Sequence, residues 1–201
     1  MTQRKAGRRG FTILESLVAI AILLVALTGP MVFAQQSLRA SRLAGDQITA
    51  FYLAQDAIEL VKHVRDENSL YRYREEWLFG LEDCLEPEAT DGGGCQVSSP
   101  EWNLTEADEA IAACYAGDCE LYEQVYPSDG APTGIFGIFA GESPERSRFS
   151  RRVKIMAADG SALDPTLSDE ALVEVDVSWS TLGVSNVRHV LVREHIYNWI
   201  Q

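Results

Sequence analysis

Basic residues are scarce in this sequence of 201 residues, in which 17 Lys and Arg stand against 30 Asp and Glu and give a formal net charge of −13. So acidic a chain has no overall attraction for the phosphate backbone, which argues against a nucleic acid as partner. The bases are also unevenly placed: residues 1–10 hold four of them and no acid, so the remainder carries 13 bases against 30 acids. A basic end on an acidic body indicates a membrane topology that is set by charge.

The sequence also lacks the residue patterns that mark common catalytic sites. No serine or cysteine lies in a recognisable nucleophile signature, and there is no glycine-rich loop of the kind that holds phosphate. The three histidines, His63, His189 and His195, are candidates for acid–base or metal chemistry, and the last two share a face of a predicted strand. Because nothing else supports chemistry at these positions, surface histidines are the simpler interpretation. We therefore predict no catalytic residue and no metal site.

One long apolar segment is present, from Phe11 to Ala34. Six of its 24 residues interrupt a run of Ile, Leu, Val, Ala, Met and Phe, and these are Thr12, Glu15, Ser16, Thr28, Gly29 and Pro30. A helix needs about 20 residues to cross the core of a bilayer, so this segment is long enough to span one. A secretory signal peptide has a shorter apolar stretch and a small-residue cleavage site. Because bases precede the span, the N-terminus is predicted in the cytoplasm and the body outside it.

Glu15 is the one ionisable residue in this apolar segment. A carboxylate inside a bilayer costs about 3 kcal/mol or more unless it has a partner, so Glu15 is a candidate functional residue. The residues around it are Gly10-Phe11-Thr12-Ile13-Leu14-Glu15-Ser16-Leu17, between a short basic leader and the apolar helix. This segment resembles the processing site of type IV prepilins and type II secretion pseudopilins.

The resemblance implies a role for three of these residues. A prepilin peptidase on the cytoplasmic side of the membrane cuts between Gly10 and Phe11 and methylates the new amine of Phe11. Glycine suits the position before the cut, because a backbone without Cβ can lie extended and close to the catalytic groups of a peptidase. Glu15, fifth in the mature chain, is then expected to pair with the N-terminal amine of a neighbouring subunit. A buried pair of that kind specifies register more than it adds stability.

Residues 35–67 continue the predicted helix as an amphipathic segment. Apolar residues recur there at steps of three and four, which predicts one wide buried face. Its positions are Ile48, Ala50, Phe51, Leu53, Ala54, Ala57, Ile58, Leu60, Val61 and Val64. Gly29 and Pro30 predict a kink or local melting in the preceding span. The expected plan is therefore a removed leader at 1–10, a transmembrane and filament-core segment at 11–34, this amphipathic segment, and an extracytoplasmic head at 68–201.

Three segments near the C-terminus predict strands. Residues 171–179 alternate strictly between apolar and other side chains over most of their length, which is the period of a half-buried antiparallel strand. Residues 149–156 and 187–199 are the other two, with a hairpin connection at 181–186. These segments are similar to the strands that end many minor pilins. The sequence thus predicts an α+β, pilin-like fold in which the long helix packs on an antiparallel sheet.

Residues 80–145 are rich in Gly, Pro, Asp and Glu, with a predicted short helix at 106–115 and an apolar strand or packed loop at 134–140. This insertion contains all four cysteines, which are Cys84, Cys95, Cys114 and Cys119. Disulfides persist outside the cytoplasm, and four cysteines allow three pairings. We favour Cys84 with Cys95 and Cys114 with Cys119, because each closes a local loop; a zinc site of four thiolates or free thiols are the alternatives. Many pilins bracket a C-terminal loop with one disulfide, whereas these cysteines precede the last strands, which argues against a major adhesive pilin.

Two clusters of charge complete the candidates. An acidic loop before a late strand holds Asp159, Asp164, Asp169 and Glu170. Some pseudopilins hold calcium in a comparable loop, but this spacing matches no defined calcium motif, so a solvated turn is the simpler interpretation and no other cofactor is expected. Four arginines gather around Phe149 and are expected at a solvated strand edge, and these are Arg146, Arg148, Arg151 and Arg152.

Together these features predict a structural subunit, a minor pilin or pseudopilin, of a type IV pilus or type II secretion-like filament. Its expected partners are the prepilin peptidase, other pilin or pseudopilin subunits and the inner-membrane assembly machinery. Its expected location is the inner membrane as a single-pass protein, then a surface or periplasmic filament. The main alternative is a membrane-anchored binding or adhesion module that does not polymerise, and a more remote one is an anchored enzyme that uses the histidines. Processing after Gly10 and dependence on Glu15 separate the filament hypothesis from both.

Overall fold

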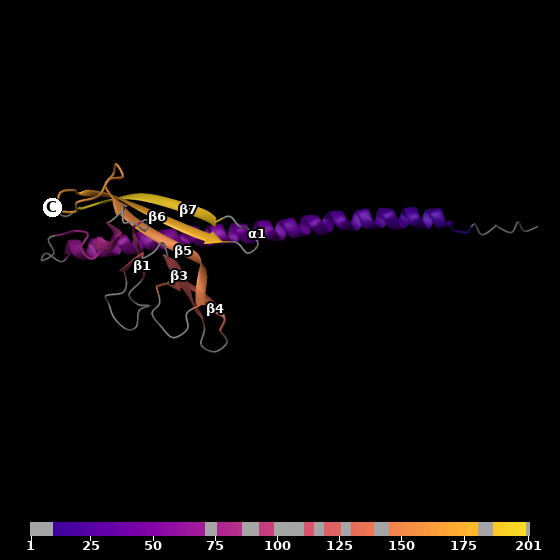
Figure 1. The fold of residues 1–201 in the computed structure, drawn as a ribbon, viewed down its shortest axis with the longest axis horizontal. Coiled ribbons are helices and arrows are strands. Elements are labelled where there is room, and N and C mark those ends of the chain that lie inside the picture. Colours follow the sequence, from indigo (N-terminus) through magenta and orange to yellow (C-terminus); the bar gives the residue numbers. More distant parts are fainter. Residues whose placement is uncertain are drawn as a thin grey trace, which may run out of the picture. The chain divides into compact units, whose positions relative to one another are not determined.

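The computed structural model of the chain describes residues 10–70, 76–85, 93–98, 111–114, 119–125, 130–138, 145–180 and 187–199. The chain divides into two compact units, Met1–Asp46 and Gln47–Gln201, which we call the N-terminal unit and the head unit. Helix α1 (Ile13–Leu70) begins in the first and ends in the second, and every strand of the described residues lies in the head unit (Figure 1). A long apolar helix followed by an antiparallel sheet confirms the predicted α+β, pilin-like architecture.

Helix α1 continues without interruption through Gly29 and Pro30. The local melting that these residues predict is therefore absent. Proline removes one backbone N–H from the helical ladder, yet neighbouring residues and hydroxyl side chains allow proline inside membrane helices. In the turn before Pro30, the hydroxyl of Thr28 donates to the carbonyl of Val25 at 3.1 Å.

Within the head unit α1 buries a face of small and branched side chains. Its buried apolar residues are Ala50, Leu53, Ala54, Ala57, Ile58 and Val61. Three alanines on this face let the helix approach the sheet closely. The apolar core of the head unit forms between the helix and the sheet. Ile48 and Phe51 were predicted on the same face but are 57% and 45% exposed. They lie on the flanks of the helix, beyond the arc that the sheet covers.

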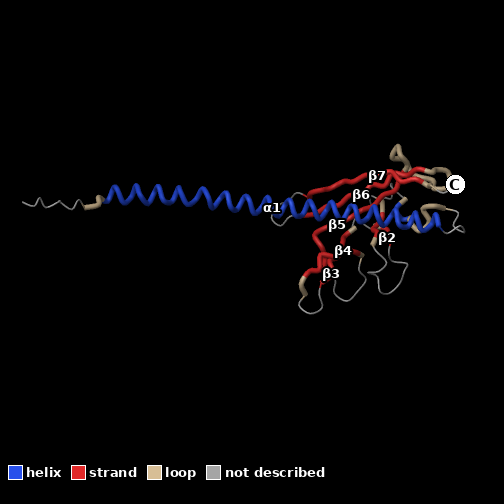
Figure 2. The backbone as a smooth tube through the Cα atoms, turned by 180° about the vertical axis from the view of Figure 1, so that it is seen from behind, coloured by secondary structure: helices blue, strands red, loops and turns tan. Residues whose placement is uncertain are grey.

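Seven strands form the antiparallel sheet, with β5 at its centre. The strands are β1 (Cys95–Val97), β2 (Ile111–Ala113), β3 (Glu120–Val125), β4 (Pro132–Gly137), β5 (Glu145–Met156), β6 (Glu170–Ser180) and β7 (Val187–Tyr197). One edge of β5 pairs with β6, which pairs with β7. The other edge of β5 is shared, because Val153 pairs with Cys95 of β1 and the N-terminal half of β5 pairs with β3. β2 then pairs with β1. β4 pairs with β3, and the two are labelled next to each other in Figure 2.

The alternation of apolar and other residues that predicts β6 matches the alternation of buried and partly exposed side chains along the strand. The residues that face the core are Ala171, Val173, Val175, Val177 and Trp179, whereas the residues between them are partly exposed. The predicted strands at 149–156 and 187–199 are confirmed in β5 and β7. The expected hairpin connection at 181–186 lies outside the described residues.

The insertion at 80–145 contains more regular structure than its sequence predicts. A single 3-10 turn, η1 (Glu82–Cys84), and strands β1, β2 and β3 are present there. Residues 111–113 form β2, so the helix expected at 106–115 is wrong at these positions, and its other described residue, Cys114, is not helical. The apolar strand expected at 134–140 is present as β4, which ends at Gly137. Strands of three residues are too short to show a period, and pairing with distant segments decides their conformation.

Gly94 brings the start of β1 against β5. Its φ is +91°, and a Cβ at this position would lie 2.6 Å from the carbonyl oxygen of Val153. Alanine here would strain the backbone and also displace β5, so we expect Gly94→Ala to lower the free energy of unfolding of the head unit by about 2–4 kcal/mol. Urea unfolding of the full chain in detergent, followed by tryptophan fluorescence, measures this loss, because Trp77 and Trp179 are both buried in the head unit.

Gly80→Ala is the matched control for that prediction. Gly80 also has a positive φ, +85°, but nothing lies within 4 Å of a Cβ built on it. Its replacement therefore introduces only the backbone strain, about 1–2 kcal/mol. Equal losses for the two variants would contradict the close contact of Gly94 with Val153.

Candidate functional site

The predicted processing site lies just before the first turn of α1. Gly10, Phe11 and Thr12 belong to neither a helix nor a strand, and all three are exposed. Nothing lies within 4 Å of a Cβ built on Gly10, and Phe11 is 73% exposed. The peptide bond between Gly10 and Phe11 is therefore open to an enzyme and free of regular hydrogen bonds. A peptidase can take up such a bond without first unfolding a helix.

Thr12 caps the N-terminus of α1. Its hydroxyl accepts a hydrogen bond from the backbone N–H of Glu15 at 3.3 Å, and its carbonyl accepts one from the N–H of Ser16 at 3.2 Å. Threonine at the N-cap with glutamate three residues later is the spacing of a capping box, and a carboxylate in the first turn also complements the helix dipole. This role was not predicted, although the Thr-x-x-Glu spacing was a sufficient signal. The carboxylate of Glu15 therefore lies in the first turn of α1, where negative charge is favourable.

The first part of α1 exposes its apolar side chains. The helix contains a segment that is long and apolar enough to cross a membrane, and none of that segment is buried inside the protein. Leu14 and Val25 are each 74% exposed, and Phe33 is 73% exposed. So large an apolar surface is unfavourable in water, which is consistent with a single-pass membrane anchor.

Two disulfides link the segments of the insertion. Cys84 of η1 is joined to Cys95 of β1 with a Cα–Cα distance of 4.7 Å, and Cys114 is joined to Cys119 at 5.1 Å. This is the pairing that the sequence analysis favours, and none of the four cysteines remains as a free thiol for zinc. Cys84, Cys95 and Cys119 are fully buried. Each bridge closes a short loop, which in the chain-entropy account stabilises the fold by about 2–3 kcal/mol.

The three histidines lie at separate places on the surface of the head unit, each beside a carboxylate. Nδ1 of His189 is 3.2 Å from Asp176, and Nδ1 of His195 is 2.8 Å from Glu170. Nε2 of His63, on α1, is 3.7 Å from Glu67 one turn later. Within the described ranges, no three His, Cys, Asp or Glu side chains gather as a metal site would require. Their arrangement is that of separate surface contacts between a histidine and a carboxylate.

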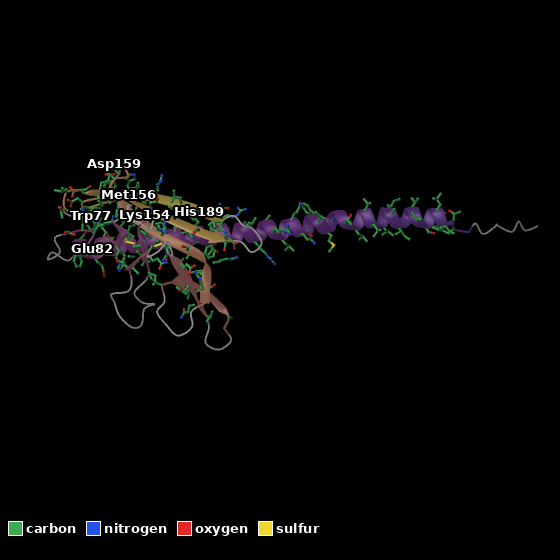
Figure 3. The ribbon with its side chains drawn as sticks, in the orientation of Figure 1. Trp77, Glu82, Lys154, Met156, Asp159 and His189 are labelled. Carbon is green, nitrogen blue, oxygen red and sulfur yellow. A yellow bond between two sulfur atoms is a disulfide. The ribbon has the colours of Figure 1, made fainter. Side chains whose placement is uncertain are left out.

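The carboxylates of the acidic loop accept hydrogen bonds in separate turns. Asp159 accepts hydrogen bonds from the N–H and hydroxyl of Ser161, and Asp164 accepts the same pair from Thr166. The hydroxyl of Ser161, then its N–H, holds the pKa of Asp159 below its usual value, and Thr166 does the same for Asp164. Asp169 binds Asn198, and Glu170 lies beside His195. Figure 3 shows Asp159 at one end of the head unit, away from His189.

Two adjoining hollows of about 400 and 510 Å³ lie beside α1 and strands β4 and β5 in the head unit. They share Thr49, Gly134 and Phe136, and their other walls combine aromatic, aliphatic and charged side chains. None of the histidines is among the described residues that line them.

One comparison with known proteins finds a match. A family model described as the prokaryotic N-terminal methylation motif matches residues 5–29, a range that contains Gly10, Phe11 and Glu15. No curated protein and no solved structure matches the chain. The matched motif is the signature of proteins that a prepilin peptidase processes, and it includes the exposed, non-helical residues 10–12 directly before the apolar helix. The chain therefore carries, in residues 5–29, the N-terminal methylation motif that is the signature of type IV pilins and pseudopilins.

Proposed function

We propose that this chain is a structural subunit, a minor pilin or pseudopilin, of a type IV pilus or type II secretion-like filament. The observation that carries the proposal is the methylation motif at residues 5–29, in which the exposed, non-helical residues 10–12 directly precede an unburied apolar helix. Signal anchors share the apolar helix, but they have no need of glycine, phenylalanine and glutamate at these three positions.

Before assembly the chain is held in the inner membrane by the first part of α1. Residues 1–10 are on the cytoplasmic side, because they carry the bases, and the acidic head unit is outside. That orientation agrees with two disulfides in the head unit, since disulfides persist outside the cytoplasm. Cleavage by the prepilin peptidase removes the leader and leaves a positively charged amine on Phe11.

Assembly transfers the apolar helix from lipid to the core of a filament of other pilin or pseudopilin subunits. Lipid and a bundle of apolar helices are similar solvents for leucine and valine, so packing and polar contacts decide the register. The methylated amine of Phe11 and the carboxylate of Glu15 on a neighbouring subunit supply such a contact. Inner-membrane assembly machinery drives the transfer, and the protein itself performs no catalysis.

A subunit of low copy number, or one at the filament tip, suits the head unit best. The insertion at 80–145 adds disulfide-linked segments between α1 and the central strands of the sheet. Such an addition is bulky for a position that must repeat along a dense lattice. Counting this subunit against the others in purified filaments tests the assignment, and a stoichiometry near one would overturn it.

Processing is the direct test of the proposed function. The full chain is expressed beside a prepilin peptidase, purified from membranes and analysed by mass spectrometry of its N-terminal peptide. We expect a chain that begins with methylated Phe11. Gly10→Val should block the cut, because a branched side chain obstructs the peptidase, whereas the matched leader variant Gly7→Val should be processed normally.

Retention of Met1 and the basic leader, beside a peptidase that processes a control substrate, would reject the filament proposal. The chain would then be an anchored binding or adhesion module. A chain that is processed but absent from filaments would instead reject the proposed assembly and leave the proposed processing intact.

A further inference from the structure

Two arginines, Arg39 and Arg42, follow the apolar segment of α1. They are the only charged residues of the sequence between Glu15 and Asp46. Both are exposed on the helix, and no hydrogen bond or ion pair joins either side chain to another described residue. Arginine is always charged in proteins, so these two guanidinium groups are cations without a partner in the described part of the chain. They are therefore open to an anion from outside it.

The two arginines lie close together on one face of α1. Residues three apart on a helix are neighbours, with about 5–6 Å between their Cβ atoms. Like charges at this spacing repel and destabilise a helix, by an amount that an anion between them would remove. No acid lies within one turn of Arg39, and Asp46, one turn after Arg42, is buried. The pair therefore forms a cationic site that its own helix does not neutralise.

The place of the pair along α1 corresponds to a membrane surface. The apolar segment ends at Ala34, and the three residues after it are polar. At a rise of about 1.5 Å per residue, Arg39 lies about 7.5 Å and Arg42 about 12 Å beyond Ala34. The headgroup layer on each side of a bilayer core is about 5–8 Å thick. Arg39 is therefore level with the outer part of that layer, and Arg42 lies just above it.

Helix geometry directs both side chains back toward the lipid. In a helix the Cα–Cβ bond tilts toward the N-terminus, which in α1 is the side of the membrane span. A long side chain therefore covers the turn that precedes its own Cα, about 5 Å nearer to the lipid. Arginine at such a position lays its methylene stem along apolar surface and keeps its charge among polar groups. The guanidinium groups of Arg39 and Arg42 can thus reach the level of the lipid phosphates together.

A phospholipid is the anion that this position offers. Guanidinium groups bind phosphate through paired N–H···O bonds. Lipid phosphates surround α1 at this level whenever the chain is in a membrane, whereas an acidic surface of another subunit is present only during assembly. A free phosphate ion has the same binding chemistry, but nothing holds it at this depth. An anionic lipid adds a net charge that a zwitterionic headgroup lacks, so electrostatic attraction favours the anionic lipid.

We propose that Arg39 and Arg42 form a binding site for the headgroup of an anionic phospholipid at the C-terminal end of the membrane span. The bound phosphate neutralises the pair and fixes the depth of α1 in the bilayer. The inference rests on the membrane anchor of the proposed function, and on neither processing nor assembly.

The full chain in micelles of a maltoside detergent, which contains no phosphate, tests the proposal. Phosphatidylglycerol is added, and the side-chain Nε–Hε signals of Arg39 and Arg42 are followed by NMR. We expect both signals to shift and the shifts to reach saturation. Phosphatidylcholine should bind at least about fivefold more weakly, because its headgroup has no net charge. Inorganic phosphate at the same concentration should shift neither signal, since no acyl chain holds it in the micelle.

Arg39→Gln and Arg42→Gln should each weaken the binding of phosphatidylglycerol by about fivefold, and the double variant by about twentyfold. Backbone amide signals of residues 38–43 report binding in these variants. Glutamine is a good helix former, so α1 is expected to remain intact. Arg188→Gln is the matched control, because it removes one exposed base from the head unit. Its affinity for the lipid should stay within about twofold of that of the original chain.

Equal weakening by Arg188→Gln and Arg39→Gln would reduce the effect to general attraction of charge and overturn the proposal. Equal shifts with inorganic phosphate and with phosphatidylglycerol would also overturn it, since the ligand would then be any phosphate ion. A double variant that keeps full lipid binding but is lost from filaments would reject the lipid site and assign the arginines to a neighbouring subunit. All binding measurements use the unprocessed chain in micelles, so a failure here and a failure of the proposed function are distinguishable.

Discussion

Glu15→Gln is expected to leave the chain in the membrane and to reduce its incorporation into filaments by about a hundredfold. Once the leader is removed, the amine of Phe11 carries a positive charge at the edge of an apolar helix bundle. Leaving such a charge without its partner costs about 3 kcal/mol, which corresponds to about a hundredfold in incorporation. The measurement is the amount of chain in purified filaments relative to the amount in the membrane fraction.

Glutamine is chosen because Glu15 lies three residues after the N-cap Thr12, and glutamine serves at that position of a capping box as well as glutamate does. The variant therefore removes the charge and keeps the capping residue. Thr12→Ala is the matched control, because it removes the capping oxygen and keeps the carboxylate. Loss of a cap costs about 1 kcal/mol, so its incorporation should fall only about fivefold. Normal incorporation of Glu15→Gln would limit Glu15 to the helix cap and reject the pairing.

The processing segment could be predicted because its chemistry is local. A basic leader, a glycine, a phenylalanine, a glutamate and an apolar run lie together within the first thirty-four residues, and each type has a reason that needs no distant contact. Strand β6 could be predicted for a related reason. One of its faces packs on the core and the other is partly solvated, so the requirement for alternation appears in the strand itself.

Arg151 shows where such reasoning ends. Its sequence neighbours include three other arginines, which predicted a solvated strand edge, but its side chain is fully buried. A buried arginine requires partners, and those of Arg151 are nearly a hundred residues earlier on α1 and about fifty earlier on β1. Strands β1, β2 and β3 were missed because their conformation depends on pairing across the same distances. The exposure of Ile48 likewise depends on how much of α1 the sheet covers, which the sequence of α1 alone does not determine.

Arg151→Ala is expected to lower the free energy of unfolding of the head unit by about 3–5 kcal/mol. Nη1 donates to the carbonyl of Leu53 at 2.9 Å and to Oδ2 of Asp56 at 2.7 Å, and Nη2 donates to the carbonyl of Val97. Burial lowers the pKa of the guanidinium, whereas the hydrogen bond and charge of Asp56 raise it. Alanine removes all three bonds and leaves a cavity where the side chain was. Urea unfolding in detergent, followed by tryptophan fluorescence, measures the loss.

Arg151→Met separates the hydrogen bonds from the cavity, because methionine fills most of the volume of the arginine stem. Its expected loss is about 1–3 kcal/mol, which is the cost of leaving buried carbonyl groups without a donor. Asp56 is 55% exposed at its side chain and is readily hydrated, so Asp56→Ala should add little to Arg151→Met. If the losses in unfolding free energy of Arg151→Met and Asp56→Ala simply added in the double variant, the pairing of Arg151 with Asp56 would be contradicted. A guanidinium that joins α1, β1 and β5 at one point determines where the helix crosses the sheet, and hence which face of α1 remains exposed beside the hollows near β4.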